Sequence, residues 1–168
     1  MKHLLKSKRS CFQGLCVAIS LLLFASSARA ESGPFTGLAG NWTGTGAIVL
    51  GDGTKERIRC HATYSVSAEG NGLQQSLRCA SDSYRFDLSS SVTHQDGQLS
   101  GVWNEASRNM SGMLLGSARA GRFAVVVTSP SFSANLTLTT RGDRQSVEIS
   151  APPGGQLTGV SITLSRGK

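Results

Sequence analysis

The chain has 168 residues, with 17 Lys and Arg against 10 Asp and Glu, so its formal net charge is +7 at pH 7. This length favours a single domain, because domains usually run about 100–200 residues. The longest apolar stretch is shorter than the ~20 residues that a membrane-spanning helix needs, and the even spread of apolar residues argues against wholesale disorder.

The first thirty residues have the order of a targeting segment. A basic start over 2–9 precedes an apolar run over 15–24, and Ala28-Arg29-Ala30 follows. This order is typical of a secretory signal peptide, with cleavage expected between Ala30 and Glu31. We therefore predict an exported protein, periplasmic or secreted, with no membrane span in the mature chain.

Removal of the predicted signal peptide changes the charge. Residues 1–30 hold five basic and no acidic side chains, which leaves 12 basic against 10 acidic ones and a net charge of +2. The remaining basic residues are scattered rather than clustered, so we expect no nucleic-acid partner. The predicted domains are a signal peptide over 1–30, a short tail over 31–37 and a folded domain over 38–166.

The mature chain alternates apolar and polar residues in short segments separated by turn residues, which is the pattern of β-strands. The alternation begins at Trp42, and Gly51-Asp52-Gly53 is an example of a turn. About ten strands are expected, near 41–50, 57–66, 73–79, 84–89, 99–105, 110–118, 123–128, 132–140, 145–150 and 157–165.

Short strands joined by tight turns must be antiparallel, since each parallel crossover needs a dozen or more residues. We predict an all-β fold, a single up-and-down barrel of about 8–10 strands and roughly lipocalin size. A two-sheet sandwich is the alternative. Glycines within the first and sixth segments, Gly44 and Gly46 and then Gly112 and Gly116, suit the coiled corners of a barrel.

Cys60 and Cys79 are the two cysteines of the predicted mature chain, and an oxidising compartment favours a disulfide between them. A hairpin register that pairs them also aligns the apolar faces of both strands and centres the turn on Glu69-Gly70. A two-residue Asn71-Gly72 turn would instead separate the cysteines by about four residues along the strand, roughly 13 Å. The disulfide and that turn exclude each other, and we predict the disulfide.

Catalytic and metal-binding patterns are scarce. His61 lies on a polar strand face and His94 in a turn, without further ligands at metal-binding spacing. Asp87, Glu105 and Glu148 would form a carboxylate pair only if the fold brought two of them together. We therefore expect no enzyme, no metal and no cofactor.

Glu105 continues the alternation of Leu99, Gly101 and Trp103 and is a candidate for the barrel interior, where a carboxylate must be paired or hydrogen-bonded. The interpretation that we favour is simpler: the strand ends near Asn104, which leaves Glu105 in solvent. The candidate interior residues are Trp42, Tyr64, Phe86, Trp103 and Glu105.

Gly40-Asn41-Trp42 resembles the G-x-W signature of lipocalins and their calycin relatives. The resemblance, which runs from Leu38 to Gly46, implies a barrel and assigns no binding residue. The chain is also similar to a family of small exported proteobacterial β-barrel proteins. Leu38–Trp42 is echoed in Leu99–Trp103, which suggests two half-barrels of about five strands each.

Two functions from different classes stay open at this point. The first is the binding of a small apolar or amphiphilic ligand inside the barrel. The second is a protein-interaction or inhibitor module with a filled barrel, whose loops engage an envelope protein. The aromatic bulk inside the barrel discriminates between them.

Overall fold

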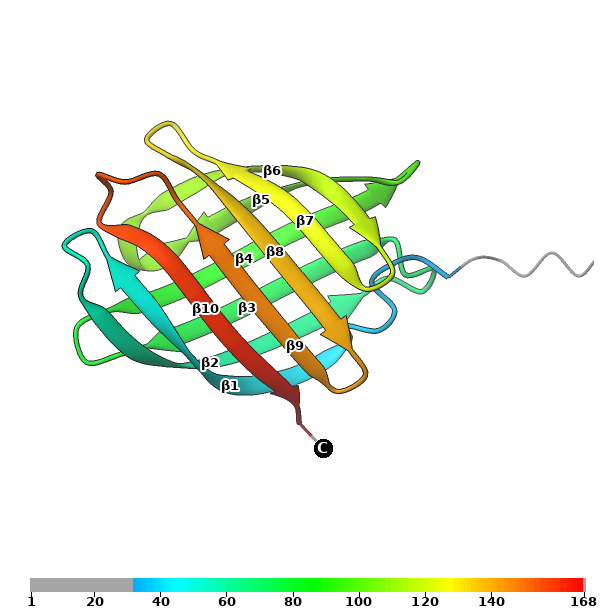
Figure 1. Cartoon of the computed structure of the whole chain (residues 1–168). Helices are drawn as coiled ribbons and strands as arrows, with labels where there is room; N and C mark the ends of the chain where they lie inside the picture. Colours follow the sequence, from blue (N-terminus) through cyan, green and yellow to red (C-terminus); the bar gives the residue numbers. More distant parts are fainter. Residues whose placement is uncertain (1–31, 168) are drawn as a thin grey trace, which may run out of the picture. The chain divides into compact units, whose positions relative to one another are not determined.

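The computed structural model describes residues 32–167 (Figure 1), so the predicted signal peptide and its cleavage site lie outside the described residues. The described chain is almost entirely β-structure, with one short 3-10 helix, η1. The elements are β1 (Gly40–Leu50), β2 (Lys55–Val66), β3 (Gly72–Ala80), β4 (Arg85–Gln95), β5 (Gln98–Glu105), η1 (Ala106–Arg108), β6 (Met110–Arg119), β7 (Arg122–Thr128), β8 (Ser133–Arg141), β9 (Arg144–Ser150) and β10 (Leu157–Arg166).

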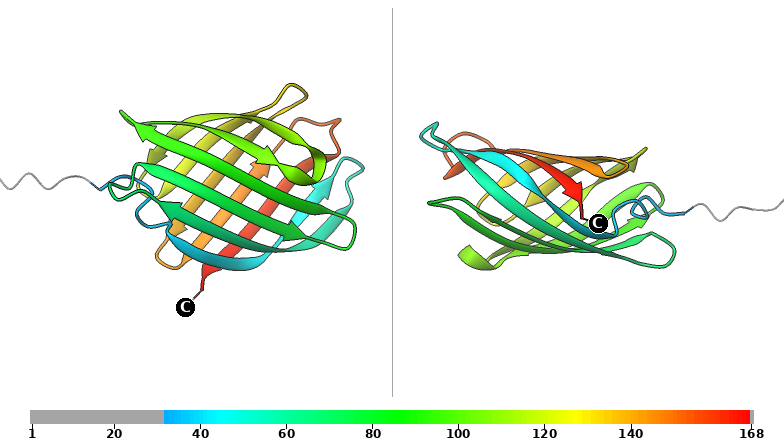
Figure 2. Two further views of the ribbon diagram at one scale, coloured as in Figure 1. Left: turned by 180° about the vertical axis from the view of Figure 1, so that it is seen from behind. Right: turned by 90° about the horizontal axis from the view of Figure 1, so that it is seen from below.

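The ten strands form a closed antiparallel barrel in which each strand pairs with its neighbours in the chain. The barrel closes where β1 meets β10, with Trp42 opposite Arg166 and Ile48 opposite Val160. Figure 2 shows this arrangement from behind and from below. The predicted up-and-down barrel is confirmed, and the sandwich is wrong.

The β2–β3 hairpin has the register that the cysteines predict. Cys60 lies opposite Cys79, with their Cα atoms 4.1 Å apart, and a disulfide joins them. The turn is centred on Glu69-Gly70, where Gly70 has a φ of 77° that favours glycine. Asn71 precedes β3 and does not form a two-residue turn with Gly72, because the disulfide fixes the other register.

Glycines allow neighbouring strands to approach closely at the corners of the barrel. A Cβ at Gly44 would collide with the carbonyl oxygen of Thr163 on β10, and one at Gly112 with that of Thr128 on β7. Gly46 and Gly116 are equally crowded. The strands therefore coil tightly at these points, as the sequence predicts.

The barrel has two different ends. At the end that we call the plugged end lie residues 33–39 and the turns after β2, β4, β6 and β8. At the other, the distal end, lie the turns after β1, β3, β7 and β9 together with η1. Within residues 32–167, no helix is long and apolar enough to cross a membrane.

The suggested five-strand repeat is not reproduced by the topology. Leu38–Trp42 leads into β1, whereas Leu99–Trp103 lies in β5, four strands later. A duplicated half-barrel of five strands would place the second copy at β6. The two tryptophans also differ in environment, since Trp42 donates to the carbonyl of Leu38 and Trp103 to that of Met113 on the adjacent strand.

Candidate functional site

Residues 33–38 fold across the plugged end. Phe35 and Leu38 are only 1% and 2% exposed, and the ring of Phe35 stacks on that of Phe123 with centroids 5.6 Å apart. The amide of Phe35 donates to the carbonyl of Gly70 in the β2–β3 turn. The segment predicted to be a short tail is therefore part of the folded core, and the described domain begins before residue 38.

Arg166 fastens this segment to the barrel. Its guanidinium lies 4.4 Å from the centre of the buried Trp42 ring and donates to the carbonyls of Gly37, at 2.5 Å, and Ala39. Asp143, in the β8–β9 turn, accepts from its Nε at 3.1 Å. One side chain thus connects the two ends of the described chain and covers the tryptophan.

A buried polar contact crosses the barrel just inside the plugged end. The hydroxyl of Tyr64 donates to Oε1 of Gln145 at 2.7 Å, and Nε2 of Gln145 donates to Thr140. Burial raises the pKa of Tyr64 well above its usual value, against a smaller opposing effect of the Gln145 bond. The phenol therefore stays neutral and acts as a donor.

Toward the distal end, inward-facing apolar side chains are not fully covered. Val125 lies between Gly116 and Leu136 in the sheet, and Leu136 lies between Val125 and Ile149. These valine, leucine and isoleucine side chains pack against the core, yet they remain half-buried although both flanking strands are paired. Their position in the alternation directs these side chains to the inside of the barrel. The same half-buried state is shared by Leu77, Phe86, Leu88, Met110 and Val127.

The lumen carries one polar pair in its middle. Ser90, 7% exposed, donates to Oε1 of the half-buried Gln75 at 2.9 Å across the β3–β4 pair. The amide nitrogen of Gln75 donates to none of the described residues. Between the two ends of the barrel, the inward-facing residues of the described chain are uncharged. Such a wall suits an apolar molecule with a hydrogen-bond acceptor.

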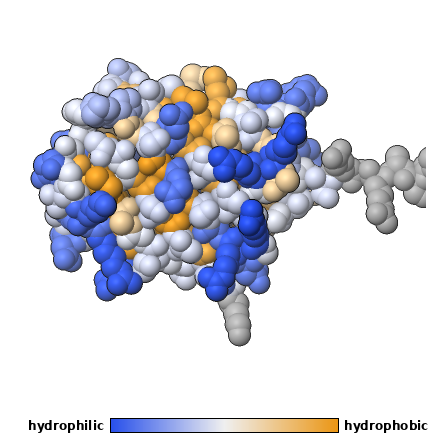
Figure 3. Space-filling model, in the orientation of Figure 1, coloured by the Kyte–Doolittle hydropathy of each residue, from blue (hydrophilic) through white to orange (hydrophobic). Residues whose placement is uncertain are grey.

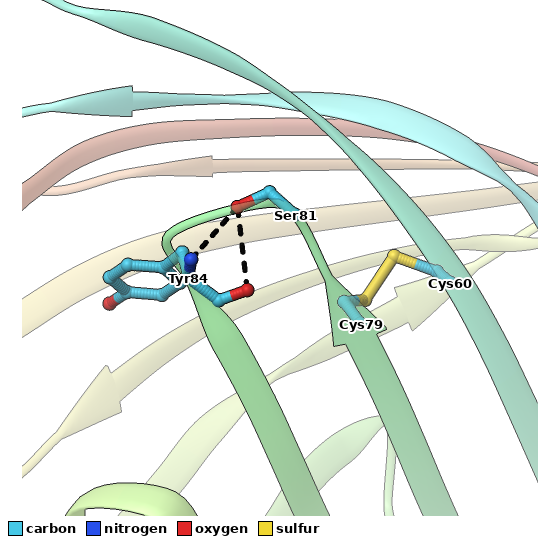
Figure 4. Close-up of a disulfide and its surroundings, with 4 residues drawn as sticks. All are labelled: Cys60, Cys79, Ser81 and Tyr84. Atoms are coloured by element: carbon cyan, nitrogen blue, oxygen red, sulfur yellow. Dashed lines mark hydrogen bonds between the residues drawn. A yellow bond between two sulfur atoms is a disulfide. The ribbon is translucent and has the colours of Figure 1, made fainter.

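The disulfide forms part of the wall near the distal end (Figure 4). Cys60 and Cys79 are 5% and 4% exposed. Beyond them, the hydroxyl of Ser81 accepts from the amide of Tyr84 at 2.9 Å, which tightens the β3–β4 turn. Glu56, at the start of β2, accepts from Ser81 at 2.6 Å, so the β3–β4 turn is tied to β2 on one side of the barrel mouth.

An aromatic and charged cluster lies at another part of the mouth. The guanidinium of Arg108, in η1, lies 3.8 Å from the centre of the Tyr84 ring, which contacts Phe86 with centroids 4.7 Å apart. Burial raises the pKa of Tyr84, while the charge of Arg108 opposes this. The candidate interior residue Phe86 is therefore half-buried at the mouth rather than deep in the core.

Glu105 is the last residue of β5 and is 2% exposed, so the favoured expectation that it lies in solvent is wrong. The strand continues one residue further because the Glu105 carboxylate accepts from the amide of Asp87 at 2.8 Å and from the amides of Ser107 and Arg108, at 3.2 and 2.8 Å. Burial alone would raise the pKa of Glu105, but these hydrogen bonds outweigh it and lower the pKa. The carboxylate is a structural cap whose acceptor capacity is already used.

Of the other candidate residues, Trp42 and Tyr64 are in contact, with ring centroids 6.4 Å apart, whereas Trp103 lies on β5, away from β1 and β2. Trp42, Tyr64 and Trp103 are buried on different strands, at 0%, 3% and 6% exposure. His61 is exposed on the outside of β2, and His94 is hydrogen-bonded to Asn71 at 3.1 Å. Within residues 32–167 no group of three potential metal ligands is assembled.

Sequence reasoning missed Phe35, Gln75, Gln145 and Arg166. The last three continue the alternation of their strands and occupy inward positions, which was the available signal. A polar residue at an inward position gives no indication of its partner, however, because Gln145 is 81 residues away from Tyr64. Phe35 lies before the first strand, where no alternation exists.

Comparison with known proteins identifies the fold only. No protein-family model matches the chain, and no curated protein does. The crystal structure of Rv2717c from M. tuberculosis matches with a TM-score of 0.64 and 12% identity, over 79% of this chain and 94% of that one. The S-type phycobiliprotein lyase CPES from Guillardia theta matches with a TM-score of 0.59 and 13% identity, over 80% and 90%. At these identities the likeness shows a shared fold, a small β-barrel.

Proposed function

We propose that this chain is an exported, non-catalytic binding protein that holds a small apolar or amphiphilic molecule in the distal half of its barrel. The observation that carries the proposal is the set of inward-facing, half-buried apolar side chains around Val125, Leu136 and Ile149. Because aromatic side chains fill the plugged end, we assign the ligand to the part of the barrel between the Gln75–Ser90 pair and the mouth.

Three further features support parts of this proposal. The disulfide is typical of an oxidising compartment, which agrees with export. The barrel resembles that of a phycobiliprotein lyase, although the likeness is one of fold. For the absence of catalysis, the support is that Asp87, Glu105 and Glu148 are each engaged in a structural contact, with Arg78, backbone amides and Ser161 respectively.

The proposal is tested by native mass spectrometry of the processed protein, purified from its own host after expression of the full chain. A mass excess of ligand size that is lost on denaturation is the expected result. A parallel titration uses a fluorescent anilinonaphthalene probe, which should bind at one saturable site.

Two adjacent residues on β8 provide a matched pair of variants. Leu136 points into the lumen and Thr137 points outward. Leu136→Trp should weaken probe binding at least tenfold by filling the lumen, whereas Thr137→Trp should leave it unchanged. An unliganded protein that binds no probe, or equal effects of the two variants, would contradict lumen binding and favour an interaction module with a filled barrel.

A further inference from the structure

Four arginines flank two hairpin turns at the plugged end. The β6–β7 turn consists of two residues, with Arg119 before it and Arg122 after it. The β8–β9 turn is equally short, with Arg141 before it and Arg144 after it. Because a two-residue turn places the residues on either side of it directly opposite each other, each turn brings two arginines face to face. All four residues are exposed, and we call them the arginine cluster.

The two turns are neighbours in the fold. Strands β7 and β8 are paired, and the amide of Thr140, before the second turn, donates to the carbonyl of Gly121, in the first, at 2.8 Å. Two strand spacings, about 10 Å, separate one arginine pair from the other. The barrel therefore gathers basic residues that are scattered along the sequence. Figure 3 shows strongly hydrophilic residues at the right of the view, where the plugged end lies in Figure 1.

The arginine cluster has no ion-pair partner among residues 32–167. Asp143, in the second turn, is paired with Arg166 at 3.1 Å, so these two charges compensate each other. Glu148 accepts from Ser161 and lies about 14 Å along β9 from Arg144. The cluster therefore keeps a concentrated positive charge.

The turn geometry does not require arginine at these positions. The β4–β5 turn lies at the same end and also consists of two residues, and Gln95 and Gln98 face each other across it. A neutral pair therefore fits this place in the fold. Like charges directly opposite each other destabilise a sheet, so the two arginine pairs lower a stability that neutral pairs would keep. This loss indicates that the charges serve a purpose other than folding.

We propose that the arginine cluster attaches the plugged end of the barrel to the surface of a bilayer that contains anionic phospholipids. Arginine is permanently charged, and its planar guanidinium matches the geometry of phosphate oxygens. Clusters of about four or more basic residues are attracted to anionic lipids at a membrane surface. The four arginines lie exposed at the rim within about 15 Å, so an extended surface can reach them together.

Apolar surface beside the arginine cluster favours a bilayer over a polyanion in water. Leu115 and Val126 face outward on the strands of the first arginine pair and are 57% and 46% exposed. They lie about 14 Å from Arg119 and Arg122, with no charged residue between them on these strands. Basic and apolar side chains on one surface suit the boundary between headgroups and acyl chains. A nucleic acid, by contrast, offers mainly phosphate charge and would leave the apolar side chains in water.

The test measures vesicle binding by co-sedimentation of the processed protein, after expression of the full chain. The vesicles contain phosphatidylcholine alone, or equal parts of phosphatidylcholine and phosphatidylglycerol. Wild-type protein should bind only the mixed vesicles and should be released as the salt concentration rises. Arg119→Gln together with Arg122→Gln should weaken binding about 30-fold, because each arginine at such a surface contributes about fivefold.

Arg57→Gln together with Arg59→Gln is the matched control. These exposed residues lie toward the distal end of β2 and carry the same total charge. Their replacement should change vesicle binding by less than about threefold, because charges more than about 10 Å from the contact are screened. The thermal midpoint of the Arg119 and Arg122 variant should be unchanged or higher, since a like-charge pair is removed.

Wild-type protein that binds neither kind of vesicle would overturn the proposal. Equal losses in the two double variants would overturn it too, because binding would then follow the overall charge. A lower thermal midpoint in the Arg119 and Arg122 variant would show that these arginines serve folding. Protein that ignores vesicles but binds polyphosphate or duplex DNA through the cluster would replace the bilayer by a polyanion in water. None of these results depends on ligand binding in the lumen.

Discussion

Replacing Arg166 by methionine should detach residues 33–39 from the plugged end. Methionine keeps an apolar stem over the Trp42 ring but removes the guanidinium that now lies 4.4 Å from the ring centre. The carbonyls of Gly37 and Ala39 lose their charged donor. The ion pair with Asp143 is lost as well.

The magnitude follows from these contacts. A hydrogen bond to a charged group contributes about 1.5–3 kcal/mol, although solvent can replace the donor at exposed carbonyls. The cation–π contact adds about 1 kcal/mol. The ion pair contributes less than about 1 kcal/mol, because the Asp143 side chain is 82% exposed. Because these contributions are not additive, we expect Arg166→Met to lower the free energy of unfolding by about 3 kcal/mol.

Urea unfolding, followed by tryptophan fluorescence and far-ultraviolet circular dichroism, measures this change. Asp143→Ala is the control and should cost under about 1 kcal/mol, since it removes only the exposed partner. The reasoning would be refuted if Arg166→Met lay within about 1 kcal/mol of wild type. A loss in Asp143→Ala as large as that in Arg166→Met would refute it too, because the ion pair would then be the main contribution.

Three further predictions concern stability. Replacing both Cys60 and Cys79 by alanine should cost about 3 kcal/mol in urea unfolding, because the disulfide closes a loop with a sequence separation of 19; an unchanged midpoint would contradict this. Folding lowers the pKa of Glu105, so its carboxylate stabilises the folded protein at pH values above the unfolded pKa of about 4.3. This stability is lost as the pH falls through the folded pKa. Glu105→Gln should therefore flatten the decline of the urea midpoint between about pH 5 and 3. An equally steep decline in the variant would count against it. Tyr64→Phe leaves Oε1 of the buried Gln145 without its donor and should lower the free energy of unfolding by about 1–3 kcal/mol, measured by thermal unfolding. Tyr84→Phe is the control and should cost less, because the Tyr84 hydroxyl makes no hydrogen bond among the described residues.

The strand pattern predicted most of the barrel because its causes are local. Alternation of apolar and polar residues decides which face of a strand is buried, and Gly44 and Gly112 mark points where only a residue without Cβ fits. The cysteine spacing fixed the β2–β3 register, since a disulfide tolerates only a short Cα separation. These arguments need no knowledge of distant parts of the chain.

Glu105 shows where local reasoning ends. Its position in the alternation was visible, but the choice between solvent and interior depended on the amides of Asp87 and η1, which the turn brings together only in the folded protein. Phe35 shows the same limit, because nothing near it in sequence indicates that it stacks on Phe123. The segment that we expected to be a tail therefore closes one end of the barrel.

The sequence by itself determined the composition of the two faces of each strand, the turns and the pairing of Cys60 with Cys79. The +7 charge of the full chain belongs mostly to residues 1–30, which follows from counting alone. Only the tertiary structure decided that one end is closed by Phe35 and Arg166, that the inward-facing Leu136 is half-buried, and that β5–β7 share an uncharged outer face with exposed apolar side chains. These features join residues that are far apart in the chain, and closure of the barrel is the physical event that brings them together.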